Sequence, residues 1–325
     1  MTNHLLCVIM ISCRDTACRV RKFLSTGHGT PCPYKIKGES LLLKLTDINT
    51  LRDLLTRHGI ILSKGMGQNF LINPSICPRM AQAAGIDEST GVIEIGPGVG
   101  VLTLELAKLA GRVIAIELDE RLRPVLSETL GDFDHIDVIF GDVLRLNLHQ
   151  IIKEKLAGFD RIVVCANLPY YITSPIVMGL LENRLPIDSI TVMVQREAAE
   201  RMCAAVGSRE SGAVTVAVNF YSNPGILFRV SPGSFLPPPK VESAVMRLDV
   251  IKDLPDVPEE AEKAFWALVK AGFGQRRKTL CNAAGNAFGK ERVLAALESA
   301  GLPSTARIEQ LSMAQLWDVS RRLVV

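Results

Sequence analysis

The chain has 325 residues, 48% of them hydrophobic, and a formal net charge of +3 with a pI of about 8.4. This length allows one large domain with a smaller one, and the mild basic balance permits an acidic partner without the strong charge of a dedicated nucleic-acid module. The eight cysteines form no C-x-x-C pair, which argues against a zinc site and a disulfide framework, and no apolar run approaches the roughly 20 residues that cross a bilayer.

Residues 1–45 are predicted to be an N-terminal extension outside the folded domains. Up to position 40 this segment has only two acids, Asp15 and Glu39, and it contains half of the cysteines. Its apolar stretch, "LLCVIMIS", is too short for a membrane span and has no charged region before it. We expect a disordered or spurious extension, and an organelle transit peptide is the alternative.

Organised sequence begins near Thr50. The spacing of Leu51, Leu54 and Leu55 predicts a helix, and Thr50 with Asp53 suggests its cap. A polar loop that contains glycine, "SKGMGQNFLINP", follows this helix and leads to the main series of elements.

Strands and helices then alternate along the chain. The predicted strands span residues 91–96, 112–119, 136–142, 161–166 and 189–195, and the predicted helices span 101–110, 120–130, a stretch around 148–156, and 196–205. Two further strands are predicted at 212–222 and 241–250 without a long helix between them, which indicates an antiparallel finish at one edge. The alternation predicts an α/β fold with a parallel, doubly wound sheet.

The pattern changes after residue 253. Three helical patterns, 259–274, 290–302 and 305–323, follow without a strand between them. Asp256 and Pro258 stand where a cap and a first-turn proline belong. We therefore predict a main α/β domain at 46–252 and a small all-α domain at 253–325.

A glycine loop, "EIGPGVG" at 94–100, joins the first predicted strand to its helix. In a doubly wound sheet this is where a nucleotide-like ligand binds, because glycine lets the backbone approach it closely. A dinucleotide-binding loop requires a glycine at position 101, and Val101 stands there instead. The pattern is an acid followed by three alternating glycines, which is weak evidence for a ligand when taken alone.

Acids at the ends of the next two predicted strands indicate which kind of nucleotide-like ligand binds. Glu117 ends the second strand, where a carboxylate accepts hydrogen bonds from both hydroxyls of a ribose. Asp142 ends the third, where it can accept from an adenine amino group while Val143 offers its backbone amide. A ribose and an adenine without a phosphate grip favour S-adenosylmethionine over NAD. The alternative is that these acids only cap the following helices.

The fourth strand ends in "NLPYYITSP", from position 167 to 175. The side-chain carbonyl of Asn167 and the backbone carbonyl of Leu168 can hold an adenine amine in the geometry that attacks a sulfonium methyl group, and Pro169 stiffens the turn. Tyr170 can stack on a base that has left its helix. An ordinary turn after a strand is the alternative.

Six segments of the chain resemble the KsgA family of bacterial small-subunit ribosomal RNA adenine N6,N6-dimethyltransferases. They are "GQNFLINPSI", "VIEIGPGVGVLTLELA", "GDVL", "NLPYYITSPI", "FLPPPKVESAV" and "FGQRRKTLCN", in the order typical of the family, and the match runs from about Thr50 to the C-terminus. The resemblance implies a class I (Rossmann-like) methyltransferase sheet in the catalytic domain at 46–252 and a helical RNA-contacting domain at 253–325. Leu168 differs from the second residue of the N/D-P-P-Y motif of DNA adenine methyltransferases.

The activity that the resemblance implies is the dimethylation of N6 on two adjacent adenosines in the 3′-terminal hairpin of 16S rRNA, with a role in small-subunit biogenesis. It also implies S-adenosylmethionine as the methyl donor, no metal, 16S rRNA within the small ribosomal subunit as the partner, no membrane, a monomer, and a cytoplasmic location.

Individual roles follow from the same resemblance. The residues expected at the cofactor are Gln68, Asn69, Leu71, Gly96, Gly98, Glu117, Asp142, Val143 and Asn167. The residues expected at the target base are Asn167, Leu168, Pro169, Tyr170 and Phe235. Phe235 is expected to sandwich the base opposite Tyr170, and a place in the core is its alternative.

A basic run, Arg276, Arg277 and Lys278, is expected to contact the RNA backbone, or else to form a solvated helix face. Three other functions stay open: a 23S rRNA adenine N6-methyltransferase of the antibiotic-resistance type, a non-catalytic ribosome- or nucleic-acid-binding relative, and a dehydrogenase. Val101 argues against the last of these, and the intact turn from Asn167 to Tyr170 argues against a loss of catalysis.

Overall fold

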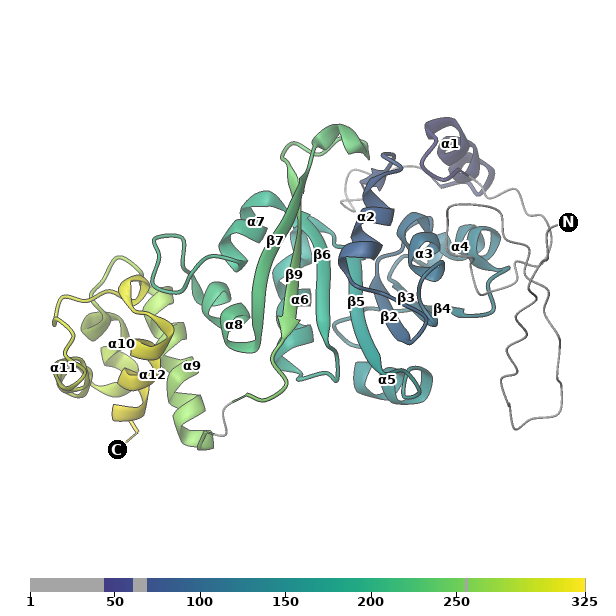
Figure 1. Ribbon diagram of the computed structural model, residues 1–325. Coiled ribbons are helices and arrows are strands. Elements are labelled where there is room, and N and C mark those ends of the chain that lie inside the picture. The colour runs from purple at the N-terminus through teal and green to yellow at the C-terminus, as the bar shows by residue number, and fades with distance from the viewer. Residues whose placement is uncertain (1–43, 61–68, 255–256, 325) are drawn as a thin grey trace, which may run out of the picture. The chain divides into compact units, whose positions relative to one another are not determined.

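The computed structural model describes residues 44–60, 69–254 and 257–324, which belong to one compact unit (Figure 1). Gln68 and Asp256 lie outside the described residues. So does the predicted extension at 1–45, except for its last two positions. The expectations for these parts of the chain therefore stay predictions.

A seven-stranded sheet forms the centre of this unit, in the order β4-β3-β2-β5-β6-β9-β7. The first five strands of this order are parallel to one another, β9 is antiparallel to β6, and β7 is antiparallel to β9. The strands are β2 (Thr90–Ile95), β3 (Arg112–Glu117), β4 (Ile136–Phe140), β5 (Arg161–Asn167), β6 (Ser189–Gln195), β7 (Ser222–Val230) and β9 (Ser243–Val250). The predicted doubly wound sheet with an antiparallel edge is confirmed.

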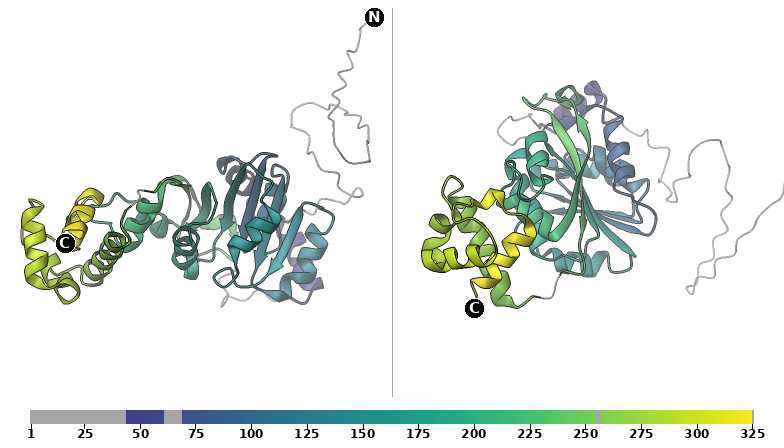
Figure 2. Two further views of the ribbon diagram at one scale, coloured as in Figure 1. Left: turned by 90° about the horizontal axis from the view of Figure 1, so that it is seen from below. Right: turned by 60° about the vertical axis from the view of Figure 1, so that its left-hand side comes forward.

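Helices cover both faces of the sheet (Figure 2), because the strand side chains alternate between two apolar layers. On one face, Ile93 and Val164 pack in the cluster that includes α5 (Leu148–Lys155), α6 (Thr173–Glu182), α7 (Arg196–Met202) and α8 (Ala213–Tyr221). On the other face, Val92 and Val163 pack with α2 (Ile76–Ala83) and α3 (Val101–Ala107). A third cluster joins α1 (Ile48–Arg57) and α4 (Arg123–Leu130).

The segment 212–222, predicted as a strand, is the helix α8, so this prediction is wrong. An apolar run with many β-branched residues fits a buried strand and a buried helix equally well. Here the Gly212 amide donates to Thr215 Oγ1 at 2.9 Å and starts the helix, whose residues are mostly buried. The edge strand is the following segment, β7, where Pro224 is tolerated because that strand has a neighbour on one side only.

Smaller differences concern how elements begin. The helix α1 starts at Ile48, and Asp47 caps it by accepting from the Thr50 amide at 2.9 Å, whereas Asp53 pairs with Arg57. Among the described elements that were not predicted are the helices α2, α6 and α10 (Leu280–Phe288), and the strands β1 (Phe70–Leu71) and β8 (Phe235–Leu236), which pair in a small antiparallel sheet.

The segment after residue 258 is helical, as predicted. It contains α9 (Glu259–Gly274), α10 (Leu280–Phe288), α11 (Lys290–Ser299) and α12 (Met313–Arg322), with Pro258 at the N-cap position of α9. The sheet and these helices belong to one compact unit, so a domain boundary at residue 252 stays a prediction.

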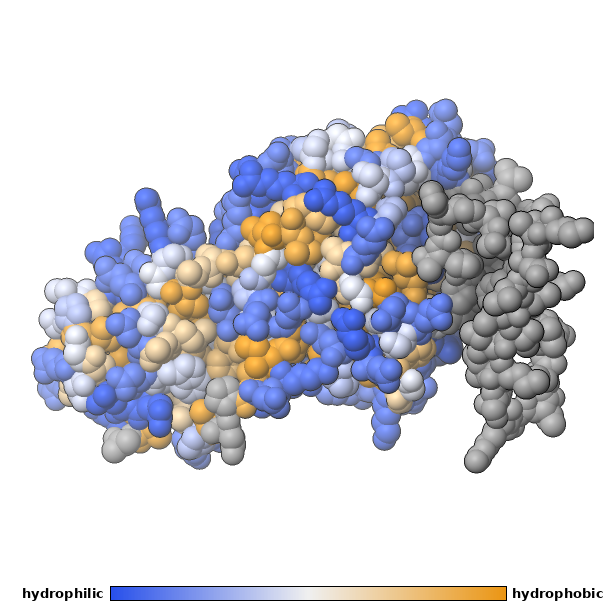
Figure 3. Space-filling view, in the orientation of Figure 1, coloured by the Kyte–Doolittle hydropathy of each residue, from blue (hydrophilic) through white to orange (hydrophobic). Residues whose placement is uncertain are grey.

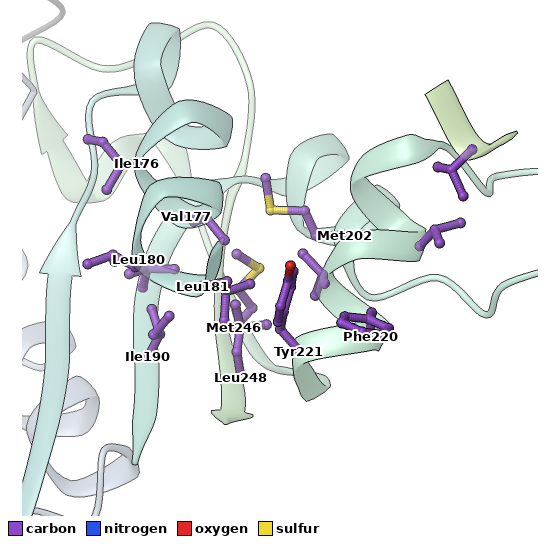
Figure 4. Packing of buried hydrophobic residues seen from close by; sticks show 14 of the residues in the cluster. Ile176, Val177, Leu180, Leu181, Ile190, Met202, Phe220, Tyr221, Met246 and Leu248 are labelled. Carbon is purple, nitrogen blue, oxygen red and sulfur yellow. The ribbon is translucent and has the colours of Figure 1, made fainter. Parts of the chain in front are cut away.

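Aromatic side chains join the two parts. Phe220 of α8 lies 5.8 Å from Phe265 and 5.1 Å from Trp266, both on α9, between ring centroids. Phe265 in turn stacks on Trp317 of α12 with centroids 4.2 Å apart. Figure 4 shows Phe220 and Tyr221 beside the apolar side chains of α6, α7 and β9, which continue this layer under the sheet.

Among the described helices, none has the length and apolar character that a bilayer span requires. Figure 3 shows hydrophilic residues spread over the face in view, with smaller hydrophobic areas between them.

Candidate cofactor and substrate cavity

A cavity lies at the carboxyl ends of β2, β3, β4 and β5. The chain passes from β2 outward to β4 and then returns to β5 on the other side of β2, and ligands bind at such a reversal of strand order. Residues that line the cavity are Asn69, Phe70, Leu71, Glu94, Ile95, Gly96, Pro97, Gly98, Val99, Val101, Leu102, Ile116, Glu117, Leu118, Asp119, Leu122, Gly141, Asp142, Val143, Asn167, Leu168, Pro169, Tyr170, Tyr171, Ile172 and Ile176.

The structure thus brings most of the predicted site residues together. The predicted residues that line the cavity are Asn69, Leu71, Gly96, Gly98, Glu117, Asp142, Val143, Asn167, Leu168, Pro169 and Tyr170. Gln68 lies outside the described residues, and Phe235 and the basic run lie elsewhere. The individual roles assigned from the sequence stay predictions.

The glycine loop leaves β2 in a backbone conformation that other residues rarely adopt. Gly96 has a φ of 71° and Gly98 a φ of 61°, in the left-handed region. A Cβ atom on Gly96 would meet no atom within 4 Å, so the requirement for glycine there is the backbone angle and the open space next to it. The amide of Gly98 donates to Glu117 Oε2 at 3.2 Å, which fixes the loop against the end of β3.

Glu117 is 6% exposed and connects two segments of the site. Its Oε1 accepts from the Asp119 amide at 2.8 Å, and its Oε2 accepts from Gly98. Burial raises the pKa of this carboxyl, while the backbone donors oppose that shift. Each oxygen keeps a further lone pair, which suits the two hydroxyls of a ribose.

The loop after β4 is shaped by Asp142. Its Oδ1 accepts from the Leu144 amide at 3.0 Å, and its Oδ2 lies 3.4 Å from Arg145 Nε. These contacts hold Val143 at the cavity wall, which Asp142 also lines. The role of these two residues at an adenine stays a prediction.

The turn after β5 carries an amide, Asn167, and an aromatic ring, Tyr170, and both residues line the cavity. The Leu168 amide donates to the Met193 carbonyl at 3.1 Å, which fixes the strand end beside β6. Pro169 caps a short 3-10 helix, Tyr170–Ile172, and the Tyr170 hydroxyl lies 2.6 Å from Ser243 Oγ. Burial raises the pKa of Tyr170, so its hydroxyl stays protonated. The contact with Ser243 holds the ring at the cavity.

Glu94 lines the same cavity, although the sequence assigned it no separate role. It is 1% exposed, and its Oε2 has no hydrogen-bond partner within the described part of the chain. Burial raises the pKa of Glu94 to about 8, and the nearby Glu117 charge adds to the shift. The Thr103 side chain opposes this shift. A buried carboxyl with one unpartnered oxygen at a cavity suits a cationic group, such as the ammonium of S-adenosylmethionine. The acid that precedes the glycines was the feature that pointed to it.

The raised pKa of Glu94 predicts that cofactor binding depends on pH. Glu94 is mostly protonated at pH 7, and an adjacent ammonium favours the carboxylate, so binding releases a proton. Affinity for S-adenosylmethionine should increase by up to about tenfold per pH unit up to pH 8. Calorimetry in buffers of different ionisation enthalpy measures the released proton.

Glu94→Gln should abolish proton release and pH dependence, and Glu88→Gln, at an exposed position, should change neither. No proton release from the unsubstituted protein would refute this coupling.

Phe235 lies in the apolar core. It is 2% exposed, does not line the cavity, and packs in the core with Val230 and Val245. Its backbone pairs with that of Leu71 across the small sheet, which directs the side chain into the core. This burial agrees with the alternative of a core phenylalanine, and the role opposite Tyr170 stays a prediction.

The basic run is neither a helix face nor a wall of the cavity. Arg276, Arg277 and Lys278 are exposed on the turn between α9 and α10. Arg276 donates to the Arg209 carbonyl at 2.7 Å, which ties this turn to the loop between α7 and α8. In the part of the chain that the structure describes, no group of histidine, cysteine and acidic side chains could hold a metal ion.

Comparison with known proteins shows which family most of the chain resembles. The sequence model of a family described as "Ribosomal RNA adenine dimethylase" matches residues 62–324. A relative named "Ribosomal RNA small subunit methyltransferase A" from Alkaliphilus oremlandii is 47% identical over 232 residues, which are 71% of this chain and 80% of the relative. A relative of the same name from Bacillus licheniformis is 43% identical over 283 residues, 86% of this chain and 96% of the relative.

Two solved structures are similar to this one. A dimethyladenosine transferase from Plasmodium falciparum has a TM-score of 0.64 and 27% identity, and covers 77% of this chain and 95% of its own. The 23S rRNA methyltransferase ErmE has a TM-score of 0.61 and 28% identity, and covers 78% and 99%. The two values are nearly equal, so fold likeness alone does not distinguish the substrates of these proteins.

Proposed function

The chain belongs to the ribosomal RNA adenine dimethylase family, and on this basis we propose that it dimethylates N6 of two adjacent adenosines in the 3′-terminal hairpin of 16S rRNA, within the small ribosomal subunit. The turn from Asn167 to Tyr170 at the wall of the cofactor cavity supports this most directly, because it places an amide acceptor next to a stacking ring. Identity to relatives named as small-subunit methyltransferases, over nearly their whole length, favours that substrate.

The chain's own residues act by positioning. When bound, S-adenosylmethionine supplies a methyl group that is activated by the positive sulfur. Asn167 and the Leu168 carbonyl accept from the adenine amine, which frees its lone pair from the ring, and Tyr170 holds the base by stacking. A general base is not required, since the methylated amine loses its proton readily once formed.

Location and assembly follow from the substrate. We propose that the protein acts as a monomer in the cytoplasm during small-subunit biogenesis, because the assembling subunit itself supplies the larger binding surface. The turn with Arg276, Arg277 and Lys278 is then an exposed basic site for the RNA backbone.

Charge reversal at this turn should weaken RNA binding. We expect the double substitution of Arg277→Glu and Lys278→Glu to lower affinity for small subunits and to reduce the slope of log affinity against log salt by about 1 to 2. Arg276→Glu should weaken binding further, because it also removes the contact with Arg209. Filter binding across a salt series measures this. Lys153→Glu, an exposed substitution on α5, is the control, and an unchanged slope in the double variant would remove the turn from the RNA surface.

The proposed function is tested by mass spectrometry of RNA after incubation with S-adenosylmethionine. Unmethylated small subunits, large subunits and naked DNA are the parallel substrates. Dimethyladenosine in small-subunit RNA alone is the expected result. Label in the large subunit would instead indicate the antibiotic-resistance type of 23S rRNA methyltransferase, which the likeness to ErmE keeps as the second candidate. No label in any substrate would indicate a relative that binds the ribosome without catalysis.

A further inference from the structure

Two consecutive tyrosines at the cavity differ in their surroundings. Tyr170 is partly buried and its hydroxyl lies 2.6 Å from Ser243 Oγ, whereas Tyr171 is 67% exposed and lines the same cavity. Among the described residues, Tyr171 is the most exposed of the large hydrophobic side chains. Single exposed aromatic rings are common on protein surfaces, but this one also lines the cavity, so its face is available to a ligand that extends out of it.

The local backbone explains why the two rings cannot serve the same base. Both belong to the 3-10 helix Tyr170–Ile172, which follows Pro169. Successive side chains of such a helix are turned by about 120° from one another. The two rings therefore point in different directions, although both residues line the cavity.

One other residue that lines this cavity has a strongly exposed apolar side chain. Leu118 is 56% exposed and follows Glu117 at the end of β3, on the side of the cavity predicted to hold the cofactor. Tyr171 follows β5, on the other side of β2, where the target base is predicted to lie. The loop before Ser243 adds an exposed lysine and an exposed valine, Lys240 and Val241, next to the anchor of Tyr170.

We propose that Tyr171 is an outer stacking platform for the nucleotide next to the target adenosine. This rests on the proposed function, which supplies a single-stranded RNA substrate with two adjacent targets. Unstacked bases of such RNA bind aromatic side chains, and the ring offers its face at the cavity mouth. While one adenine lies against Tyr170, its neighbour lies against Tyr171. Both bases are then held by one protein during one encounter, and the second can enter after the first without release of the RNA.

Kinetics with unmethylated small subunits tests this. Tyr171→Ala should raise KM for the subunit by about 5- to 100-fold, the usual worth of one stacked base. It should also increase the share of RNA in which one of the two adenosines carries methyl groups. Affinity for S-adenosylmethionine and thermal stability should stay unchanged, because the side chain is exposed. Tyr171→Phe should restore both KM and the product ratio, since stacking needs the ring and not the hydroxyl.

Leu227→Ala is the matched control. Leu227 is 41% exposed in the irregular part of β7, away from the cavity lining, and its loss should not change KM. A Tyr171→Ala protein with unchanged KM and an unchanged product ratio would overturn the inference, and so would a Tyr171→Phe protein as impaired as Tyr171→Ala. If the unsubstituted protein methylated no small subunit, the proposed function would fail and this inference with it. Activity of the unsubstituted protein separates the two cases.

Discussion

Replacing Asn167 with alanine is expected to reduce turnover by about 100-fold or more, while cofactor affinity changes by less than about threefold. In the proposed mechanism, the side-chain carbonyl of Asn167 holds the adenine amine in its reactive geometry, and that contact is strongest in the transition state. The backbone of β5 keeps its place without the amide, because Asn167 pairs with Met193 of β6 through the main chain. Single-turnover kinetics and cofactor titration measure the two quantities separately.

Two further variants sharpen the result. Asn167→Asp keeps an acceptor oxygen and should lose less activity than Asn167→Ala. Asn223→Ala, at an exposed position of β7, is the matched control and should leave turnover unchanged. Retained turnover in Asn167→Ala would contradict the positioning role, and an equal loss of cofactor affinity would make Asn167 a binding residue instead.

Phe265→Ala is expected to lower the free energy of unfolding by about 3 to 5 kcal/mol. Phe265 is fully buried, stacks on Trp317, and contacts Phe220 of α8 and Trp266. Its removal leaves a cavity where α9 and α12 pack against the sheet's helical layer. Urea denaturation monitored by tryptophan fluorescence measures the change, since Trp266 and Trp317 both surround the site.

Phe265→Leu is the matched control, and should cost less than about 1.5 kcal/mol because most of the volume remains. Below the unfolding transition, Phe265→Ala should keep its affinity for S-adenosylmethionine. The described residues that line the cavity all lie between positions 69 and 176 of the sequence, so none of them belongs to the helices around Phe265. A loss below about 1 kcal/mol would mean that the aromatic contacts contribute little to joining the helices and the sheet.

Motifs at strand ends could be predicted because they depend on local chemistry. Gly96 and Gly98 adopt a conformation that favours glycine, and Glu117, Asp142 and Asn167 follow strands whose apolar, β-branched character is plain. Once the alternation of strands and helices indicates a parallel sheet, the carboxyl ends of those strands must share one edge. The site therefore followed from residue order, without any knowledge of contacts.

A prediction was wrong where the spacing of apolar residues does not distinguish a strand from a helix. The residues of α8 fit a strand as well as a helix, and the identity of the edge strand changed with that assignment. The helix α6 was not predicted. It begins within the motif that contains Asn167, which was interpreted as a turn with a chemical role.

The sequence by itself determined the fold class and the meeting of the glycine loop, the strand-terminal acids and the Asn-x-Pro-Tyr turn at one cavity, because these residues end or follow strands of one parallel sheet. Only the tertiary structure decided the burial of Phe235, the raised pKa of Glu94 and the contact of Arg276 with Arg209. Each of these depends on atoms from segments far away along the chain, such as Leu71 beside Phe235. Exposure and ionisation are set by the neighbours that folding brings together, and no local pattern encodes them.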